Sequence, residues 1–331
     1  MYREASWRSL CSMALGIAVV VAVPVTGWAH GVVGKRFFPA MLQVEDPFVA
    51  DEMGLMVEHM KSREGKETEL ELEIQKRLSP DLSIGFSGSY RIMEPSGSAP
   101  GGHMMNEEPM GSGGTAYGFS NPKFSLTYQF LRDPTHELAG TLSFGIEASD
   151  VGAKRVGALP GTTITPSLQL GKGFGDLPDS ADWLKPLAIT GSLGYNALLS
   201  GRGETEDTQN SLSWGFTVMY SIPYLQAFVK DVGIRWPFNR LIPIVEFTGE
   251  TLLSGGRSGD TTAFANPGVL WAGNYIELAV EAMIPLNDLS GPHVGIIGMV
   301  HLFLDNIAPA IFTWTPFHGV LGPSGMGSTH H

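Results

Sequence analysis

Long stretches in which apolar and small polar residues alternate one by one constrain the fold of this chain more than any other feature. In residues 82–93, for example, Leu82, Ile84 and Phe86 alternate with serine and glycine. Successive side chains of a β-strand point to opposite faces, so this period predicts strands with one apolar and one polar face. The twelve strands predicted in this way cover residues 52–61, 67–77, 82–93, 123–132, 137–149, 163–173, 187–199, 212–222, 241–253, 263–272, 275–284 and 293–304.

The length of these stretches decides between two all-β architectures. Strands of soluble proteins typically have about 5 to 6 residues, whereas a strand that crosses a membrane needs about 9 to 11. The charged fraction of 16% is also below the roughly 25% that is usual for soluble domains. We therefore predict a single antiparallel transmembrane β-barrel of twelve strands in an outer membrane. A soluble sandwich or a lipocalin-like barrel is the alternative.

The amino-terminal residues have the pattern of a secretory signal peptide. Arg3 and Arg8 precede an apolar run at 13–23, and Gly27-Trp28-Ala29 supplies the small residues of a cleavage site. The one cysteine, Cys11, lies before the apolar run. The net charge of −12 argues against nucleic acid as a partner. The predicted organisation is a signal peptide at 1–29, a periplasmic segment at 30–51, the barrel at 52–304 and a carboxy-terminal tail at 305–331.

The lengths of the connections predict the orientation of the barrel. Bacterial barrels have short turns on the periplasmic side and long loops outside. The connections at 80–81 and 133–134 are short, whereas the connection at 94–122 is long. This parity places both termini of the barrel in the periplasm. Residues 223–240 interrupt the alternation with apolar residues at near-helical spacing, which predicts a short amphipathic helix at the periplasmic rim. The tail lies either in the lumen or in the periplasm.

Four stretches carry a resemblance to known proteins. His30–Pro39, Asp46–Glu52, Asn239–Glu246 and Asn266–Trp271 resemble a group of uncharacterised proteobacterial outer-membrane proteins. In architecture, these are similar to the MetA-like barrels linked to the meta-pathway of phenol degradation, which are described as transporters. The resemblance covers most of the chain after residue 30, and its motifs are strand and turn features without catalytic meaning. It implies an outer-membrane barrel with a transport role.

Charged residues on the polar faces of the strands are the first candidate functional group. Carboxylates dominate them, and rings of carboxylates favour cations in pores. The expected function is an outer-membrane channel or uptake protein for small molecules, with a preference for cations. Alternatively, the carboxylates bind hydroxyls and plug residues and stiffen the lumen, or those of 67–77 form a solvated rim. The predicted lumen-lining residues are Glu69, Glu71, Glu73, Glu147, Glu246, Glu250, Glu277, Glu281, Arg91 and Lys123.

A cluster of soft ligands in the loop at 94–122 supports an alternative function, copper binding. Thioethers with imidazole suit Cu(I), and imidazole with carboxylate suits Cu(II). Chance clustering of the fourteen methionines is the competing explanation. His30 adds a second candidate ligand because it becomes the first residue after cleavage. The predicted metal ligands are His103, Met104, Met105, Met110 and His30, with Glu107 or Glu108 adding charge.

Catalysis is not expected. Three histidines, His136, His293 and His301, lie near serines, but no nucleophile motif or fixed acid–base spacing accompanies them. The expected partners are outer-membrane lipid and a small-molecule or metal-ion cargo, with copper as the one cofactor considered. The sequence does not indicate the oligomeric state.

Overall fold

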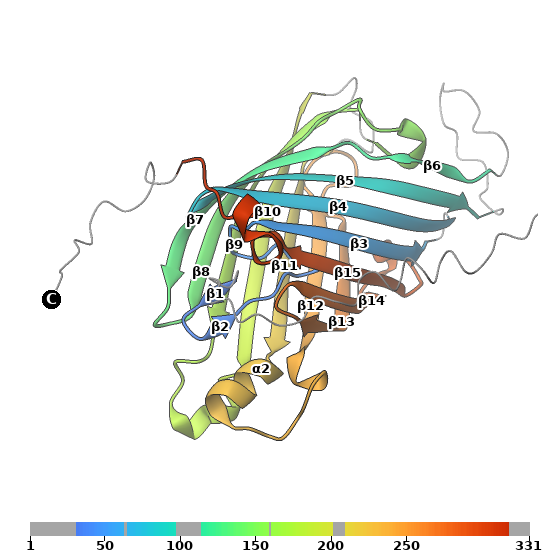
Figure 1. The fold of residues 1–331 in the computed structure, drawn as a ribbon. Coiled ribbons are helices and arrows are strands. Elements are labelled where there is room, and N and C mark those ends of the chain that lie inside the picture. The colour runs from blue at the N-terminus through green and yellow to red at the C-terminus, as the bar shows by residue number, and fades with distance from the viewer. Residues whose placement is uncertain (1–30, 63–64, 97–113, 159, 201–208, 318–331) are drawn as a thin grey trace, which may run out of the picture.

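Twelve long strands form a closed antiparallel β-barrel (Figure 1). The structure is a computed structural model that describes residues 31–62, 65–96, 114–158, 160–200 and 209–317. Neighbours along the chain pair with each other, and pairing of the last barrel strand with the first closes the sheet. The strands are β3 (Glu52–Lys61), β4 (Gly65–Ser79), β5 (Leu82–Pro95), β7 (Lys123–Asp133), β8 (Leu138–Glu147), β9 (Thr162–Gly173), β10 (Leu187–Ser200), β11 (Ser211–Tyr220), β12 (Leu241–Leu252), β13 (Thr261–Ala272), β14 (Ile276–Pro285) and β15 (Gly295–Phe303). The predicted fold class and all twelve predicted strands are confirmed.

Three short strands were not predicted. β6 (Ala116–Phe119) pairs with the far end of β5, while β1 (Val32–Val33) and β2 (Arg36–Phe37) form a small hairpin. Strands of two to four residues are too short to show a period in the sequence. Gly34 lies between β1 and β2 with φ of +62°, and a Cβ atom there would lie 2.2 Å from the carbonyl oxygen of Pro134. Only glycine fits this turn.

The two faces of the barrel wall differ as the alternation predicts. Apolar side chains point outward and remain exposed, such as Leu55 at 43%, Phe124 at 52% and Leu142 at 51%. The intervening residues point into the barrel, where Thr141 and Gln169 are buried and hydrogen-bonded to each other at 2.8 Å. The outward apolar face has no second sheet to pack against. It therefore provides the lipid-contacting surface of a transmembrane barrel.

The two ends of the barrel carry different connections. One end, here called the turn end, has the connections at 80–81, 134–137, 174–186, 221–240 and 273–275. The other, the loop end, has those at 62–64, 96–122, 148–161, 201–210, 253–260 and 286–294.

Short helices lie in the connections and after the last strand. Among the described residues, no helix has both the length and the hydropathy that crossing a bilayer requires. The helix predicted within 223–240 is confirmed as a short one, α2 (Ile222–Tyr224), which continues as η4 (Leu225–Val229) at the turn end (Figure 1). The remaining helices are η2 (Lys154–Val156), η3 (Asp179–Leu184), η5 (Phe238–Arg240), η6 (Asp288–Ser290), α3 (Leu304–Ile307) and α4 (Pro309–Phe312).

The described part of the carboxy-terminal tail packs against β4 at the turn end. Lys76 donates hydrogen bonds to the carbonyl oxygens of Phe312 at 2.9 Å and Trp314 at 2.7 Å. The backbone N–H of Phe317 donates to the carbonyl oxygen of Leu78 at 2.8 Å. Lys76 lies on the same strand face as the outward Ile74, so the tail as far as residue 317 covers the rim of the barrel from outside. These contacts place residues 312–317 outside the lumen, whereas Asp305 lies at the rim and pairs with the inward Arg77 at 3.1 Å.

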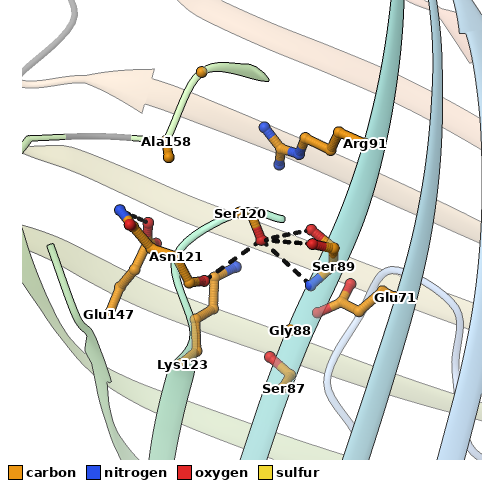
Figure 2. A pocket seen from close by; sticks show the side chains of 11 residues that line it. Glu71, Ser87, Gly88, Ser89, Arg91, Ser120, Asn121, Lys123, Glu147 and Ala158 are labelled. Carbon is orange, nitrogen blue, oxygen red and sulfur yellow. Dashed lines mark hydrogen bonds between the residues drawn. The ribbon is translucent and has the colours of Figure 1, made fainter. Parts of the chain in front are cut away.

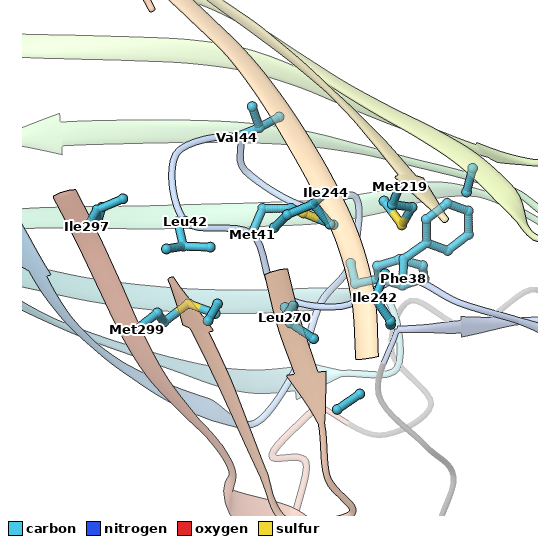
Figure 3. Packing of buried hydrophobic residues seen from close by; sticks show 14 of the residues in the cluster. Phe38, Met41, Leu42, Val44, Met219, Ile242, Ile244, Leu270, Ile297 and Met299 are labelled. Carbon is cyan, nitrogen blue, oxygen red and sulfur yellow. The ribbon is translucent and has the colours of Figure 1, made fainter. Parts of the chain in front are cut away.

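Residues 31–51, which we call the plug, lie inside the barrel. The sequence predicted a periplasmic segment ahead of the barrel for these residues, and that placement is wrong. The plug and the inward faces of the strands share one buried apolar cluster (Figure 3). The plug contributes Val33, Phe38, Met41, Leu42, Val44 and Phe48, and the wall contributes Ala139, Ala188, Met219, Ile242, Ile244, Leu270, Ala272, Ala279, Met283, Ile297 and Met299.

The composition of the inward face explains why the plug lies there. Many inward positions of β12 to β15 are apolar, for example Ile242, Leu270 and Ile297, each at most 2% exposed. An open lumen would leave these side chains in water, whereas fully burying a large apolar side chain stabilises by about 1.5–3 kcal/mol. The plug supplies the apolar partner that a single-layered wall lacks.

Candidate functional site: the lumen and its plug

Two carboxylates of the wall hold the middle of the plug through its backbone. Glu246 on β12 accepts hydrogen bonds from the N–H groups of Leu42 at 3.2 Å and Gln43 at 2.7 Å. Glu277 on β14 accepts one from the N–H of Ala40 at 3.1 Å. Backbone N–H groups in a buried loop need such acceptors. Glu246 and Glu277 therefore bind the plug, which is the alternative that the sequence left open for the inward carboxylates.

A buried histidine extends this group of carboxylates. His301 on β15 lies with Nε2 3.3 Å from a carboxylate oxygen of Glu52 and with Nδ1 3.4 Å from one of Glu277. Its ring also packs edge-on against Phe303. The histidine is 4% exposed and points into the lumen. Its ring therefore lies between the Glu52 and Glu277 carboxylates and contacts both.

Arg36 anchors the first part of the plug at the turn end. Its guanidinium group is fully buried, lies 3.2 Å from the carboxylate of Glu137 and donates to the carbonyl oxygens of Pro186 at 2.9 Å and of Lys185. The guanidinium carbon also lies 3.9 Å from the ring centre of Tyr224. Burial lowers the pKa of Arg36, and the Glu137 carboxylate opposes that shift. Burial also raises the pKa of Tyr224 to about 12, and Glu137 adds to that increase.

An aspartate anchors the last residues of the plug at the same end. Asp51 lies 2.6 Å from Lys76 Nζ and 2.7 Å from Arg77 Nε, and it also accepts a hydrogen bond from the backbone N–H of Arg77 at 2.9 Å. The N–H of Ala50 donates to the side chain of Gln75 at 2.6 Å. The plug thus begins and ends at the turn end, and its middle projects into the lumen.

The part of the plug that reaches farthest contacts the opposite wall. Glu45 accepts hydrogen bonds from the side chains of Gln169 and Ser167 on β9. Gln129 on β7 donates to the carbonyl oxygen of Pro47 at 3.4 Å. Burial among these strands raises the pKa of Glu45 above its ordinary value. The plug therefore spans the lumen from β12–β14 to β7 and β9.

A polar cavity of about 250 Å³ remains beside β5 and β7, nearer the loop end (Figure 2). Arg91 projects into it and lies 3.0 Å from a carboxylate oxygen of Glu69. Across the cavity, Glu147 accepts a hydrogen bond from Asn121 at 3.3 Å. The lining residues are Glu71, Ser87, Gly88, Ser89, Arg91, Ser120, Asn121, Lys123, Glu147, Gly157 and Ala158. Four predicted lumen residues, Glu71, Glu147, Arg91 and Lys123, therefore meet at one cavity.

A second cavity of about 280 Å³ lies between the plug and β9–β13. Glu250 lines it and accepts a hydrogen bond from Ser211. The other lining residues are Gln43, Glu45, Thr165, Ser167, Ser192, Gly194, Ser213, Trp214, Thr248, Gly249, Thr262 and Phe264. Both cavities are lined mainly by hydroxyls, amides and carboxylates, so they suit small hydrophilic solutes.

The structure does not bring the ten predicted lumen residues into one ring. All ten lie on inward strand positions, but eight of them divide into the first cavity with its Arg91–Glu69 pair, the second cavity and the contact with the plug. Glu73 lies between these groups, opposite Gly54 and Ser87 in the strand register. Glu281 is 2% exposed and lies at the wall behind the plug.

The predicted metal ligands lie outside the described residues. This holds for His30, His103, Met104, Met105 and Met110. Within the described ranges, no three His, Cys, Asp or Glu side chains form a group that could hold a metal ion. Four more Met and His side chains lie on β3, but the strand period separates them, because Met53 and His59 point outward while Met56 and Met60 point inward.

Sequence reasoning missed the plug and its anchors. Three apolar pairs, Val32-Val33, Phe37-Phe38 and Met41-Leu42, were the available signal, because a solvated periplasmic segment has no need for them. No sequence signal identified Arg36 and Glu137 as partners, since they are 101 residues apart.

The comparisons with known proteins agree with the fold. No protein-family model and no curated protein matches the chain. Among solved structures, it is similar to an outer-membrane channel from Pseudomonas putida F1, with 11% identity and a TM-score of 0.51 over 77% of this chain and 95% of that one.

Two further structures show weaker likeness. The NanC porin matches with 9% identity and a TM-score of 0.45 over 76% of this chain and 98% of that one. Outer membrane phospholipase A from Escherichia coli matches with 10% identity and a TM-score of 0.36 over 78% and 94%. The likeness to the Pseudomonas putida F1 channel agrees with the fold of an outer-membrane β-barrel. The resemblance to the MetA-like proteins stays a prediction.

Proposed function

We propose that this protein is an outer-membrane channel or uptake protein for small hydrophilic molecules, and that the plug closes its lumen. The observation that carries this proposal is that the lumen contains polar cavities on one side of the plug and tight apolar packing between the plug and the wall. Polar cavities of about 250 and 280 Å³ lie on one side of the plug, while buried Phe38 and Leu42 pack against the wall beneath them. A solute that enters the cavities can proceed only when the plug shifts.

We further propose that the turn end faces the periplasm. Short turns are periplasmic in bacterial barrels, and both the plug and the described tail lie at this end. The plug then closes the channel from the periplasmic side, and the cavities are on the outer side.

The distribution of charge supports a preference for cations. Two of the inward carboxylates, Glu246 and Glu277, are engaged with the plug, and Glu69 pairs with Arg91. In the first cavity, Glu71 and Glu147 are balanced by Arg91 and Lys123, whereas Glu45 and Glu250 line the second cavity without a basic side chain. The excess of carboxylates at the second cavity stabilises positive charge and repels anions.

The direct test is reconstitution of the folded full chain in planar bilayers. We expect discrete conductance steps and, in asymmetric KCl, a reversal potential whose sign indicates cation preference. Conductance with anion preference would refute the selectivity. Absence of any conductance and of any uptake of small polar solutes into proteoliposomes would refute the channel.

Copper binding by His103, Met104, Met105, Met110 and His30 remains a separate proposal. Replacing the three methionines with Leu keeps the apolar volume and removes the thioethers. Copper binding equal to that of the parent would refute this proposal.

A further inference from the structure

Three inward polar side chains from neighbouring strands gather at the wall behind the plug. Glu246 on β12 lies directly opposite Asn266 on β13. Glu281 on β14 lies opposite Gly268, two positions further along the same face of β13. Directly opposed and diagonal residues on one face of a sheet are within reach of each other's side chains. The strand register therefore places the Asn266 amide within reach of two carboxylates, one on each neighbouring strand.

All three side chains are buried, and two of them have no hydrogen-bond partner within the described ranges. Glu246 and Asn266 are fully buried, and Glu281 is 2% exposed. Neither the oxygen nor the nitrogen of the Asn266 amide has a partner, and the same holds for both carboxylate oxygens of Glu281. Buried polar groups nearly always have a partner, so each exception calls for a physical explanation.

The glycine opposite Glu281 shows the direction in which that carboxylate leans. A Cβ atom on Gly268 would lie 2.4 Å from Cγ of Glu281. The Glu281 side chain thus crosses the space that any larger residue at 268 would fill. Its Cγ therefore leans from β14 over β13, the strand between Glu281 and Glu246, and the lack of a side chain on Gly268 leaves the room for this.

Protonation does not account for this arrangement. A proton on Glu281 could be shared with Glu246, but the second oxygen of Glu281 would still need a donor. The Asn266 amide would stay unpartnered as well. A bound cation, in contrast, satisfies several oxygens at once and offsets the repulsion between the two carboxylates.

We propose that Glu246, Asn266 and Glu281 form a binding site for a divalent cation. The available donors are carboxylate and amide oxygens, with no thiolate or imidazole, and such ligands suit Ca²⁺ and Mg²⁺. Ca²⁺ fits better because it accepts irregular coordination and a mixture of carboxylate and carbonyl ligands. This site is distinct from the soft-ligand cluster at 103–110 in both position and chemistry.

The site would also bind the plug more firmly to the wall. Glu246 accepts hydrogen bonds from the N–H groups of Leu42 and Gln43, and each carboxylate oxygen has a second lone pair for a cation. A cation shared by Glu246 and Glu281 fixes the carboxylate that holds the plug. Removing the cation would then loosen the plug without breaking its anchors at Arg36 and Asp51.

Calorimetric titration of the folded full chain tests the site. The protein is refolded in detergent, freed of divalent ions with a chelator and titrated with CaCl₂ or MgCl₂. We expect saturable binding with one ion per chain, and at least a tenfold loss of affinity in Glu281→Gln, which keeps the shape of the side chain. Glu94→Gln is the matched control, because Glu94 is a carboxylate outside the lumen that pairs with Lys66 at 3.6 Å.

Each outcome either supports or overturns the cation site. Saturable binding of either ion that Glu281→Gln weakens and Glu94→Gln leaves unchanged supports the site. If Glu281→Gln does not fold, as judged by heat-modifiable migration, Asn266→Ala takes its place with the same expected loss. No saturable binding by the parent, or equal affinity in the parent and the folded site variant, overturns the proposal. None of these results depends on whether the barrel conducts.

Discussion

Replacing Arg36 with Ala should release the plug from the barrel wall. The guanidinium group is fully buried and contacts Glu137, two backbone carbonyl oxygens and the ring of Tyr224. Its removal leaves the Glu137 carboxylate buried, with the Tyr224 hydroxyl and the N–H of Gly175 as its remaining donors. Breaking one side of a buried ion pair typically costs about 3–5 kcal/mol. Since about 1.4 kcal/mol corresponds to a factor of ten, the undocked fraction of the plug should increase by roughly 10² to 4 × 10³.

Limited proteolysis and bilayer recordings measure this change. Chymotrypsin should cleave the variant at Phe37 or Phe38, which the docked plug protects, and its conductance should rise. Arg132→Ala is the matched control: Arg132 also donates to the plug, at the carbonyl of Val32, but this contact is exposed and should contribute about 1 kcal/mol or less. Equal cleavage and equal conductance in Arg36→Ala and Arg132→Ala would refute the anchoring role of Arg36.

Three more changes test other parts of the lumen. Glu246→Ala removes the acceptor of the Leu42 and Gln43 N–H groups, and leaving the buried Leu42 N–H unsatisfied costs about 1–3 kcal/mol, so chymotrypsin sensitivity should increase; unchanged protection would contradict this. Burial raises the pKa of Glu45, so the docked plug binds a proton more tightly than the undocked plug. Docking of the plug should therefore strengthen as the pH falls from above the raised pKa of Glu45 to its ordinary value, and Glu45→Gln should remove that part of the pH dependence. Equal pH profiles of protease protection in the parent and in Glu45→Gln would contradict this prediction. Glu71→Gln combined with Glu147→Gln should move the reversal potential toward zero, and an unchanged potential would show that the first cavity does not set selectivity.

The strands could be predicted because contact with lipid imposes a regular pattern of apolar residues on their sequence. Every outward position of a strand such as β7, with Phe124, Leu126 and Phe130, must be apolar to contact lipid, so the period of two is readable without any knowledge of neighbouring strands. The same period correctly assigned Glu71 and Glu246 to the inward face. It could not reveal what each inward residue contacts.

The plug could not be predicted because its contacts are distant in sequence and irregular in spacing. Arg36 reaches a carbonyl group 150 residues away, and Leu42 reaches Glu246 at a separation of 204. A segment without a repeating pattern has no periodic signal that would show which surface it packs on. Its apolar residues were visible, but an unoccupied lumen was the simpler assumption.

A reversible disulfide between the plug and the wall tests the central claim most directly. A Cβ atom on Gly215 would lie 2.8 Å from Cγ2 of Val44, which suits a disulfide between cysteines at these positions. Cys11 is the one cysteine in the sequence, so Val44→Cys with Gly215→Cys is made in a Cys11→Ser background, and Val44→Cys alone is the control. With the crosslink verified on non-reducing gels, we predict that the oxidised protein does not conduct in planar bilayers and that dithiothreitol restores conductance. Equal conductance before and after reduction would show that solutes pass while the plug stays in place, and would contradict the account of a plugged channel.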